Sequence, residues 1–178
     1  MTWTNKDGLV QRFGVERSAQ IQEGVSTRGV KNYLVVRVED ATDATKYPAA
    51  GGTSYPPDED APYIPANSLI TNAWFVATAS FTSGGGATLD IGLIQADGTV
   101  IDEDGLADGL TVAELTKSAS AGGVALNGAY VCNGSGSTTT VRDGSGVVTQ
   151  NSWIGITTDT STFTGGAGTL IVEYVKVA

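Results

Sequence analysis

Hydrophobic and polar residues alternate with a period of two along three stretches of the chain. In residues 33–39, Leu34, Val36 and Val38 share one face. Residues 87–93, "ATLDIGL", alternate in the same way. In residues 69–81 the apolar odd positions are Leu69, Ala73, Phe75, Ala77, Ala79 and Phe81. Because side chains of a β-strand point alternately to opposite faces, each stretch predicts a strand with one buried face. The "SGGG" turn between the last two predicts a hairpin within one sheet.

Further apolar segments are separated by turn residues. They predict strands at residues 124–132, 137–143, 146–150, 152–159 and 169–177. Residues 111–118 predict one short helix, since Thr111 and Glu114 have the spacing of a capping box. About eight strands with short turns are typical of an all-β fold. We therefore expect an antiparallel β-sandwich, jelly-roll-like in its topology.

Composition agrees with this fold class. The chain has 178 residues, a length that suits one domain, and 40% of them are hydrophobic. Glycine accounts for 24 of the 178 residues, a larger share than the about 7% of average proteins, and this indicates many turns. The longest apolar runs are only a few residues, so we expect no membrane-spanning helix. The first residues lack the basic and apolar regions of a secretory signal.

Two segments fit neither period. Residues 41–66 hold all five prolines and predict a long surface loop, in which Tyr47, Tyr55 and Tyr63 indicate packing against something else. Residues 1–29 are polar and weakly periodic, and we expect an extended N-terminal arm attached to a body of residues 30–178. The alternative is that "LVQRF" in this arm adds an edge strand to the sheet of the body.

Charge is divided unevenly along the chain. The net charge is −9, but residues 1–37 carry +3 and the remainder carries −12. An acidic body repels phosphate backbones, so we expect no nucleic-acid partner. The basic N-terminal segment is instead suited to an acidic protein surface.

The acidic residues between positions 97 and 108 are the first candidates for a metal or catalytic site. They are Asp97, Asp102, Glu103, Asp104 and Asp108. An EF-hand needs acidic or amide ligands at its first, third and fifth positions, glycine at the sixth and glutamate at the twelfth. A register starting at Asp104 puts leucine at the third and twelfth positions, so it fails. A charged loop between strands is the favoured interpretation, with a looser calcium site as the alternative.

The remaining residues also argue against catalysis. Glycoside cleavage needs two carboxyl groups facing each other across a substrate, which adjacent loop acids rarely supply. The chain has no histidine, which removes catalytic triads and most zinc sites. Cys132 is expected to be a buried, inert thiol. Trp3, Trp74 and Trp153 could stack on sugars, but packing in the core or between sheets is favoured. We therefore expect a non-enzymatic protein without metal or cofactor.

Several motifs together resemble a family of small virion structural proteins from tailed bacteriophages, especially marine podovirus-like ones. The N-terminal match consists of Trp3, Asn5, Asp7, Gly8, Leu9, Phe13, Gly14 and Glu16. "IPANSLITNAWFVATASFTSGGGATLDIGL", "DGTVIDEDGLADGL" and "FTGGAGTLIVEYV" follow in the order found in the family. The resemblance spans nearly the whole chain, but the long tyrosine- and proline-bearing loop departs from it.

The resemblance implies a capsid decoration (cement) protein on the outer surface of the head, made in the host cytoplasm. Its partners would be the major capsid protein and further copies of itself, as a homotrimer. Within the arm, Trp3 and Phe13 are the expected docking anchors, and Arg12, Arg17 and Arg28 would pair with acidic groups. The alternative function is a fibre or head-fibre module that binds host-surface polysaccharide through exposed aromatic residues.

Overall fold

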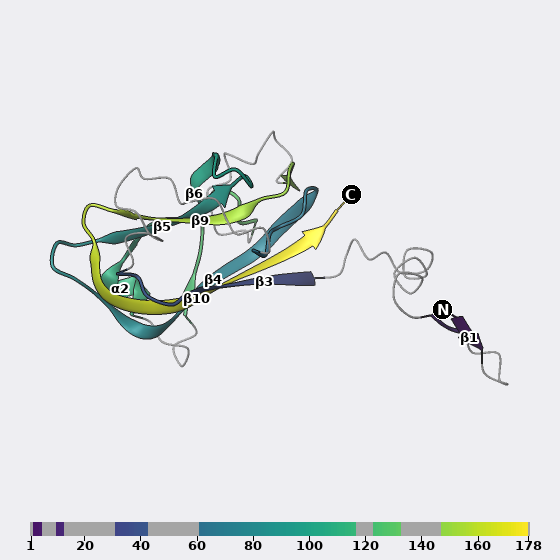
Figure 1. Ribbon diagram of the computed structural model, residues 1–178, viewed down its shortest axis with the longest axis horizontal. Coiled ribbons are helices and arrows are strands. Elements are labelled where there is room, and N and C mark those ends of the chain that lie inside the picture. Colours follow the sequence, from purple (N-terminus) through teal and green to yellow (C-terminus); the bar gives the residue numbers. More distant parts are fainter. Residues whose placement is uncertain are drawn as a thin grey trace.

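The body of the molecule is a β-sandwich. The computed structural model describes residues 31–42, 61–116, 123–132 and 147–177, together with the backbone of two short strands near the N-terminus. The strands of the body form two antiparallel sheets, seen as two layers in Figure 1. The predicted all-β sandwich is confirmed.

The larger sheet contains five strands. Strand β10 (Phe163–Lys176) lies between β3 (Lys31–Val38) and β4 (Ser68–Ser83). The other edge of β4 pairs with two short strands, β7 (Val124–Ala125) and β8 (Val147–Val148). Strand β3 is therefore an outer strand of this sheet, and the predicted strand at 33–39 is confirmed.

The smaller sheet contains three strands. Its central strand is β5 (Thr88–Ile94), which pairs with β6 (Val100–Thr111) on one side and with β9 (Trp153–Asp159) on the other. Helix α2 (Val112–Leu115) follows β6 directly. The Thr111 side chain accepts a hydrogen bond from the Glu114 backbone, and the Glu114 carboxylate accepts one from the Thr111 backbone. The capping box predicted from the sequence is thus confirmed.

The order of the strands follows a jelly roll. In that fold the first, eighth, third and sixth strands form one sheet, and the second, seventh, fourth and fifth form the other. Here β3, β10 and β4 take the first, eighth and third places, and β7 with β8 takes the sixth. Strands β9, β5 and β6 take the seventh, fourth and fifth places. Seven of the eight places are therefore filled in chain order.

The second place of a jelly roll lies beside the seventh strand, here β9. Between β3 and β4 the chain includes residues 43–60, which lie outside the described residues. Ile64, which comes directly after them, forms an isolated antiparallel bridge with Ser152 at the start of β9. The two residues exchange backbone hydrogen bonds of 2.8 and 2.9 Å. Ile64 therefore lies at the expected edge of the smaller sheet.

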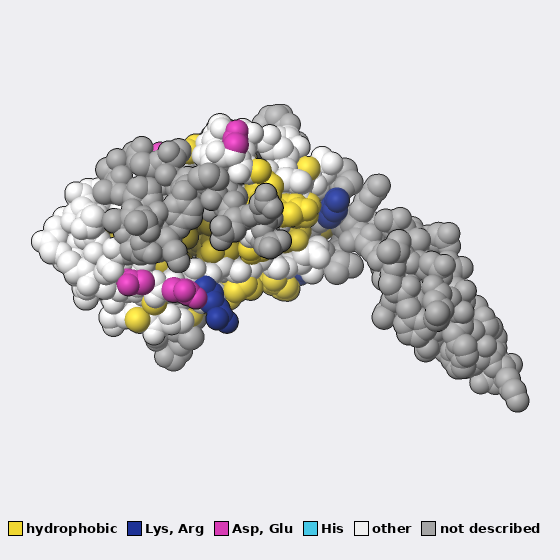
Figure 2. All heavy atoms as spheres, in the orientation of Figure 1, with side chains coloured by type: hydrophobic (Ala, Val, Ile, Leu, Met, Phe, Trp, Pro, Cys, Tyr) yellow, Lys and Arg dark blue, Asp and Glu magenta, His cyan; other side chains and the backbone are white. Residues whose placement is uncertain are grey.

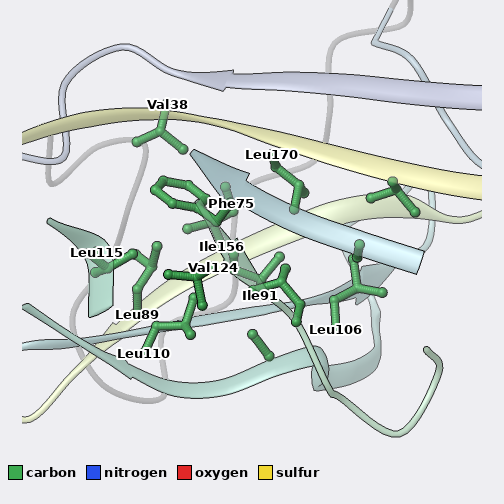
Figure 3. Packing of buried hydrophobic residues seen from close by; sticks show 14 of the residues in the cluster. Val38, Phe75, Leu89, Ile91, Leu106, Leu110, Leu115, Val124, Ile156 and Leu170 are labelled. Atoms are coloured by element: carbon green, nitrogen blue, oxygen red, sulfur yellow. The ribbon is translucent and has the colours of Figure 1, made fainter. Parts of the chain in front are cut away.

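The core lies between the two sheets (Figure 3). Phe75 and Leu170 enter it from the larger sheet, and Leu89 and Ile91 from the smaller one, each with no exposed surface. Leu115 of α2 closes one end of this cluster. Full burial of one such side chain contributes about 1.5–3 kcal/mol to folding. The inward positions predicted for residues 87–93 are confirmed.

Two predictions about the central strands are wrong. Strands β4 and β5 do not form a hairpin, because β4 belongs to the larger sheet and β5 to the smaller one. The glycine-rich turn between them carries the chain across the sandwich. Register shifts in β4 also disturb its alternation, so Ile70 is buried, Leu69 is only half-buried and Ala79 is exposed.

The N-terminal segment contains its own strand pair. Strand β1 (Thr2–Thr4) pairs antiparallel with β2 (Val10–Arg12), and this two-stranded sheet is separate from the sheets of the body. Strand β2 lies within "LVQRF" and pairs with β1 and not with a body sheet, so the alternative in which this segment adds an edge strand to the body is wrong. In the described part of the chain, no helix has the length and apolar character needed to span a membrane.

Candidate interaction surface

The residues predicted to dock the capsid are not placed by the structure. Phe13, Arg17 and Arg28 lie outside the described residues, and Trp3 and Arg12 are described only by their backbone in β1 and β2. Their docking role remains a prediction. The surface that the structure does describe in detail is the outer face of the larger sheet.

Strand β3 presents one face to the core and the other outward. Leu34 and Val38 are buried, whereas Tyr33 and Val35 are 59% and 50% exposed. Large apolar side chains at successive outward positions are unusual for a solvated strand. The exposed positions of β3 are Lys31, Tyr33, Val35 and Arg37, called here the β3 face. Figure 2 shows hydrophobic side chains at the surface in the region of β3, β4 and β10.

The strand register extends this face across the sheet. Val35 pairs with Ile171 of β10, and Ile171 pairs in turn with Trp74 of β4. Because Leu170 and Phe75, their chain neighbours, point into the core, Ile171 and Trp74 point outward. Both are half-buried. An apolar row therefore crosses three strands of the sheet on its outer side.

A buried carboxylate lies next to this row. Glu173 of β10 is only 3% exposed, and its two oxygens accept hydrogen bonds from four side chains. The donors are Thr71 Oγ1 at 2.6 Å, Tyr33 Oη at 3.0 Å, Asn72 Nδ2 at 3.1 Å and Lys31 Nζ at 3.1 Å. The carboxylate is thus bonded to both neighbouring strands, β3 and β4.

A register shift in β4 makes this arrangement possible. Glu173 pairs with Asn72 and Tyr174 pairs with Ile70, so Thr71 is the extra residue of a bulge. A bulge redirects side chains locally. Here it brings both Thr71 and Asn72 within hydrogen-bonding distance of Glu173.

The hydrogen bonds stabilise the charged form of Glu173. Donation by the Thr71 hydroxyl, reinforced by Lys31, Asn72 and Tyr33, lowers the pKa of Glu173 to about 2, although desolvation opposes the shift. The same contact with Glu173 raises the pKa of Lys31 and that of Tyr33. The carboxylate therefore remains ionised at neutral pH, in an ion pair with Lys31.

A depression lies at the other end of the β3 face. Its volume is about 390 Å³, and its lining includes Arg37, Glu39, Thr78 and Thr169. The glycines and the alanine of β10 at positions 165–168 leave this part of the sheet without large side chains. Arg37 is exposed at its edge and can reach a carboxylate of a bound partner.

The predicted acidic loop is in fact mostly a strand. Asp102, Glu103, Asp104 and Asp108 lie within β6, and only Asp97 lies in the turn that precedes it. The prediction of a loop over 97–108 is wrong. The buried residues of β6 at positions 106, 107 and 110 are not spaced with a period of two, so the sequence of this strand lacks the alternation that indicates a strand. Among the described residues no group of three or more acidic or cysteine side chains could hold a metal ion.

The acids of the smaller sheet nevertheless influence one another. Asp90 of β5 accepts a 2.6 Å hydrogen bond from the backbone of Gly109. Burial raises the pKa of Asp90, and the charges of Asp108, Asp159 and Glu103 raise it further, against the lowering effect of that hydrogen bond. Glu103, Asp104 and Asp108 are exposed, as is 38% of Val100. These four residues lie on β6, an outer strand of the smaller sheet, and are together called here the β6 face.

The aromatic candidates for sugar binding are partly brought together. Tyr63, which is 43% exposed, packs on Trp153 with ring centroids 5.0 Å apart and planes tilted by 36°. The indole nitrogen of Trp153 donates to the Ala61 carbonyl oxygen at 3.2 Å. Tyr47 and Tyr55 lie outside the described residues. Trp74 and Trp153 are half-buried on outer faces, so the expected packing in the core or between the sheets is wrong for both.

Cys132 also differs from expectation. The sequence predicts a buried thiol, but Cys132 is exposed at the end of the segment that follows β7. Its backbone nitrogen donates to the Ile70 carbonyl oxygen at 2.9 Å. Although the residue is exposed, partial desolvation of the thiol raises its pKa, which makes it a weak nucleophile at neutral pH.

Comparison with known proteins finds one weak structural similarity and no sequence match. No model of a known protein family matches the chain, and no curated protein sequence matches it. One solved structure, described as "Acidic stable capsid structure of Helicobacter pylori bacteriophage KHP30", is similar over 84% of this chain and 95% of its own. The identity is 7% and the TM-score 0.38, which is too low to establish a common fold or to assign a function.

Sequence patterns did not single out the most elaborate polar cluster, that of Glu173. A signal was present, since Glu173 is the lone acid in the apolar terminal segment "TLIVEYVKV". A carboxylate in such a segment needs hydrogen-bond donors if it is buried. The identity of those donors depends on the bulge at Thr71, which no periodicity indicates.

Proposed function

We propose that the protein is a capsid decoration protein of a tailed bacteriophage, of the marine podovirus-like kind that its sequence resembles. It would bind the outside of the head and stabilise contacts between capsid subunits, without catalytic activity or cofactor. The observation that carries the proposal is the jelly-roll order of seven strands, because this architecture is common in viral capsid proteins. The motifs spread along the chain support the same role.

The physical task of such a protein is to favour the assembled shell. A ligand that binds assembled capsid subunits, but not separate ones, stabilises the shell by mass action. A homotrimer bound at a three-fold position would join weak contacts through avidity. The major capsid protein is therefore the expected partner, and a trimer the expected oligomer.

The N-terminal segment is the proposed docking element. Residues 1–29 hold four basic and three acidic residues, a net charge of +1, beside a remainder of −10. Trp3 and Phe13 would act as apolar anchors, while Arg12, Arg17 and Arg28 would pair with acidic groups of the capsid. A segment that becomes ordered on binding can wrap a large surface.

Deletion of residues 1–29 tests this role. The deletion ends before β3 begins at Lys31, so the body sheets keep all of their strands. We expect the shortened protein to stay folded, by circular dichroism, but to lose co-sedimentation with expanded capsids. A matched control keeps the length and composition of residues 1–29 in scrambled order. If the deleted or the scrambled protein binds as well as the full chain, the segment does not dock it.

The second candidate function is binding of host-surface polysaccharide. The Tyr63–Trp153 pair favours it, because partly exposed aromatic rings are a common platform for sugars. A glycan array with the full chain tests this function, with Tyr63→Ala as the variant and Val177→Ala as a control at another exposed apolar residue. Binding that only Tyr63→Ala removes would favour this function over decoration. A turnover assay on any glycan bound separates binding from cleavage, and we expect no cleavage.

A further inference from the structure

The two sheets differ in the sign of their exposed charge. In the described part of the body the basic residues are Lys31, Arg37 and Lys176, and all three belong to the larger sheet. The strands of that sheet hold one acid, Glu173, and two further acids, Glu39 and Asp40, follow β3. In Figure 2 the Lys and Arg atoms lie on the side of the body where β3 and β10 run. The smaller sheet holds Asp90, Asp102, Glu103, Asp104, Asp108 and Asp159, with no basic residue in its described strands. Three basic residues and one acid give the strands of the larger sheet a net charge of +2, and six acids give those of the smaller sheet −6, so the larger sheet of one copy can attract the smaller sheet of another.

The complementary faces lie on opposite sides of the sandwich. Strand β3 ends the order of the larger sheet, at the side away from β7. The chain after β7 first bonds to β4, through Leu126 N and Ala73 O, and then to β6, through Gly128 N and Leu106 O at 2.8 Å. Strand β6 therefore lies at the β7 side of the molecule, with β3 at the other side.

The β3 face also has the composition of a protein contact. The β3 face combines Tyr33, Val35 and Arg37, and tyrosine and arginine are enriched at interfaces. The depression beside Arg37 leaves room for an incoming side chain. The β6 face combines exposed acids with the partly exposed Val100.

From these observations we infer that the chain binds a second copy of itself, with the β3 face of one copy against the β6 face of the next. The contact joins two different surfaces, so successive copies can close into a ring. This inference deepens the proposed homo-oligomer and rests on it, but it requires nothing of the capsid.

Charge reversal tests the contact in the full-length chain. Arg37→Glu places an acid opposite the acids of the β6 face, and Asp104→Arg places a base opposite the bases of the β3 face. Light scattering should show a multiple of 18.2 kDa for the wild type and 18.2 kDa for each single variant. The double variant, Arg37→Glu with Asp104→Arg, restores opposite charges at every contact and should recover the wild-type mass.

The control is an added charge outside the proposed contact. Thr162→Glu adds an acid at an exposed position that belongs to neither face, and this variant should keep the wild-type mass. The inference is overturned if the wild type is monomeric, if either single variant stays associated, if the double variant stays monomeric, or if Thr162→Glu dissociates as well. Capsid co-sedimentation is scored separately, so failure of this contact and failure of the decoration role can be distinguished.

Discussion

Lys31 and Glu173 form an ion pair between the first and the last long strands of the body. The Lys31 Nζ atom lies 3.0 Å from Glu173 Oε1 and 3.1 Å from Oε2. The carboxylate is almost fully buried, whereas 59% of the Lys31 side chain is exposed. The lysine can therefore keep part of its hydration while it neutralises the buried charge. Together with Tyr33, it connects β3 to the middle of the sheet.

Replacement of Glu173 should weaken the sheet. Glu173→Gln keeps the shape of the side chain but removes its charge. It also replaces one accepting oxygen by an NH2 group, which cannot accept the hydrogen bonds that the surrounding side chains donate. A broken buried hydrogen bond of this kind costs about 1–3 kcal/mol, so we expect a loss of that size in the free energy of unfolding. Urea denaturation measures it. The control is Glu39→Gln, at an exposed position after β3, which should change stability by less than about 0.5 kcal/mol.

The same residue predicts how stability depends on pH. The pKa of Glu173 is about 2 in the folded protein, against an ordinary value of 4.5. A carboxyl group with a lowered folded pKa stabilises the protein above its unfolded pKa, and this contribution is lost as the pH falls through the folded pKa. The stability difference between wild type and Glu173→Gln should therefore shrink as the pH falls from about 4.5 to about 2. A difference that stays constant over this range would contradict the role given to the charge.

The sequence predicts the fold class because strand alternation depends on local burial. Residues 87–93 alternate without interruption, and their inward positions are as predicted. The capping box at Thr111 is equally local, since its partner Glu114 is three residues away. Neither feature depends on which strands become neighbours.

The assignment of strands to sheets could not be predicted in this way. The turn after β4 is compatible with a hairpin or with a crossing of the sandwich, and only long-range pairing with β10 and β9 decides between them. The Glu173 cluster depends on the same pairing, because it joins residues more than a hundred positions apart. The β3 face and the β6 face likewise depend on which strands lie at the edges of the two sheets.

The start of α2 provides a local test of the helix. Thr111→Ala removes the side-chain oxygen that accepts a hydrogen bond from the Glu114 backbone. Loss of an N-cap side chain costs about 1 kcal/mol, and we expect that reduction in the free energy of unfolding. Thr162→Ala, at an exposed turn where only the backbone carbonyl accepts hydrogen bonds, is the matched control. Equal effects of the two substitutions would show that the cap does not contribute.

The close approach of β6 to β5 at Gly92 gives the sharpest test of the packing. Leu93 pairs with Asp102 and Ile91 pairs with Ala107, so β6 carries extra residues at this point. A Cβ atom on Gly92 would lie 2.0 Å from the Asp102 carbonyl oxygen and 2.3 Å from that of Glu103. Both are backbone atoms, which cannot move aside by rotation of a side chain. Gly92→Ala should therefore lower the free energy of unfolding by about 1–3 kcal/mol or more. Gly84→Ala is the control, because no atom lies within 4 Å of its added carbon, and it should be nearly neutral. Similar melting of both variants would mean that β6 does not approach β5 as described.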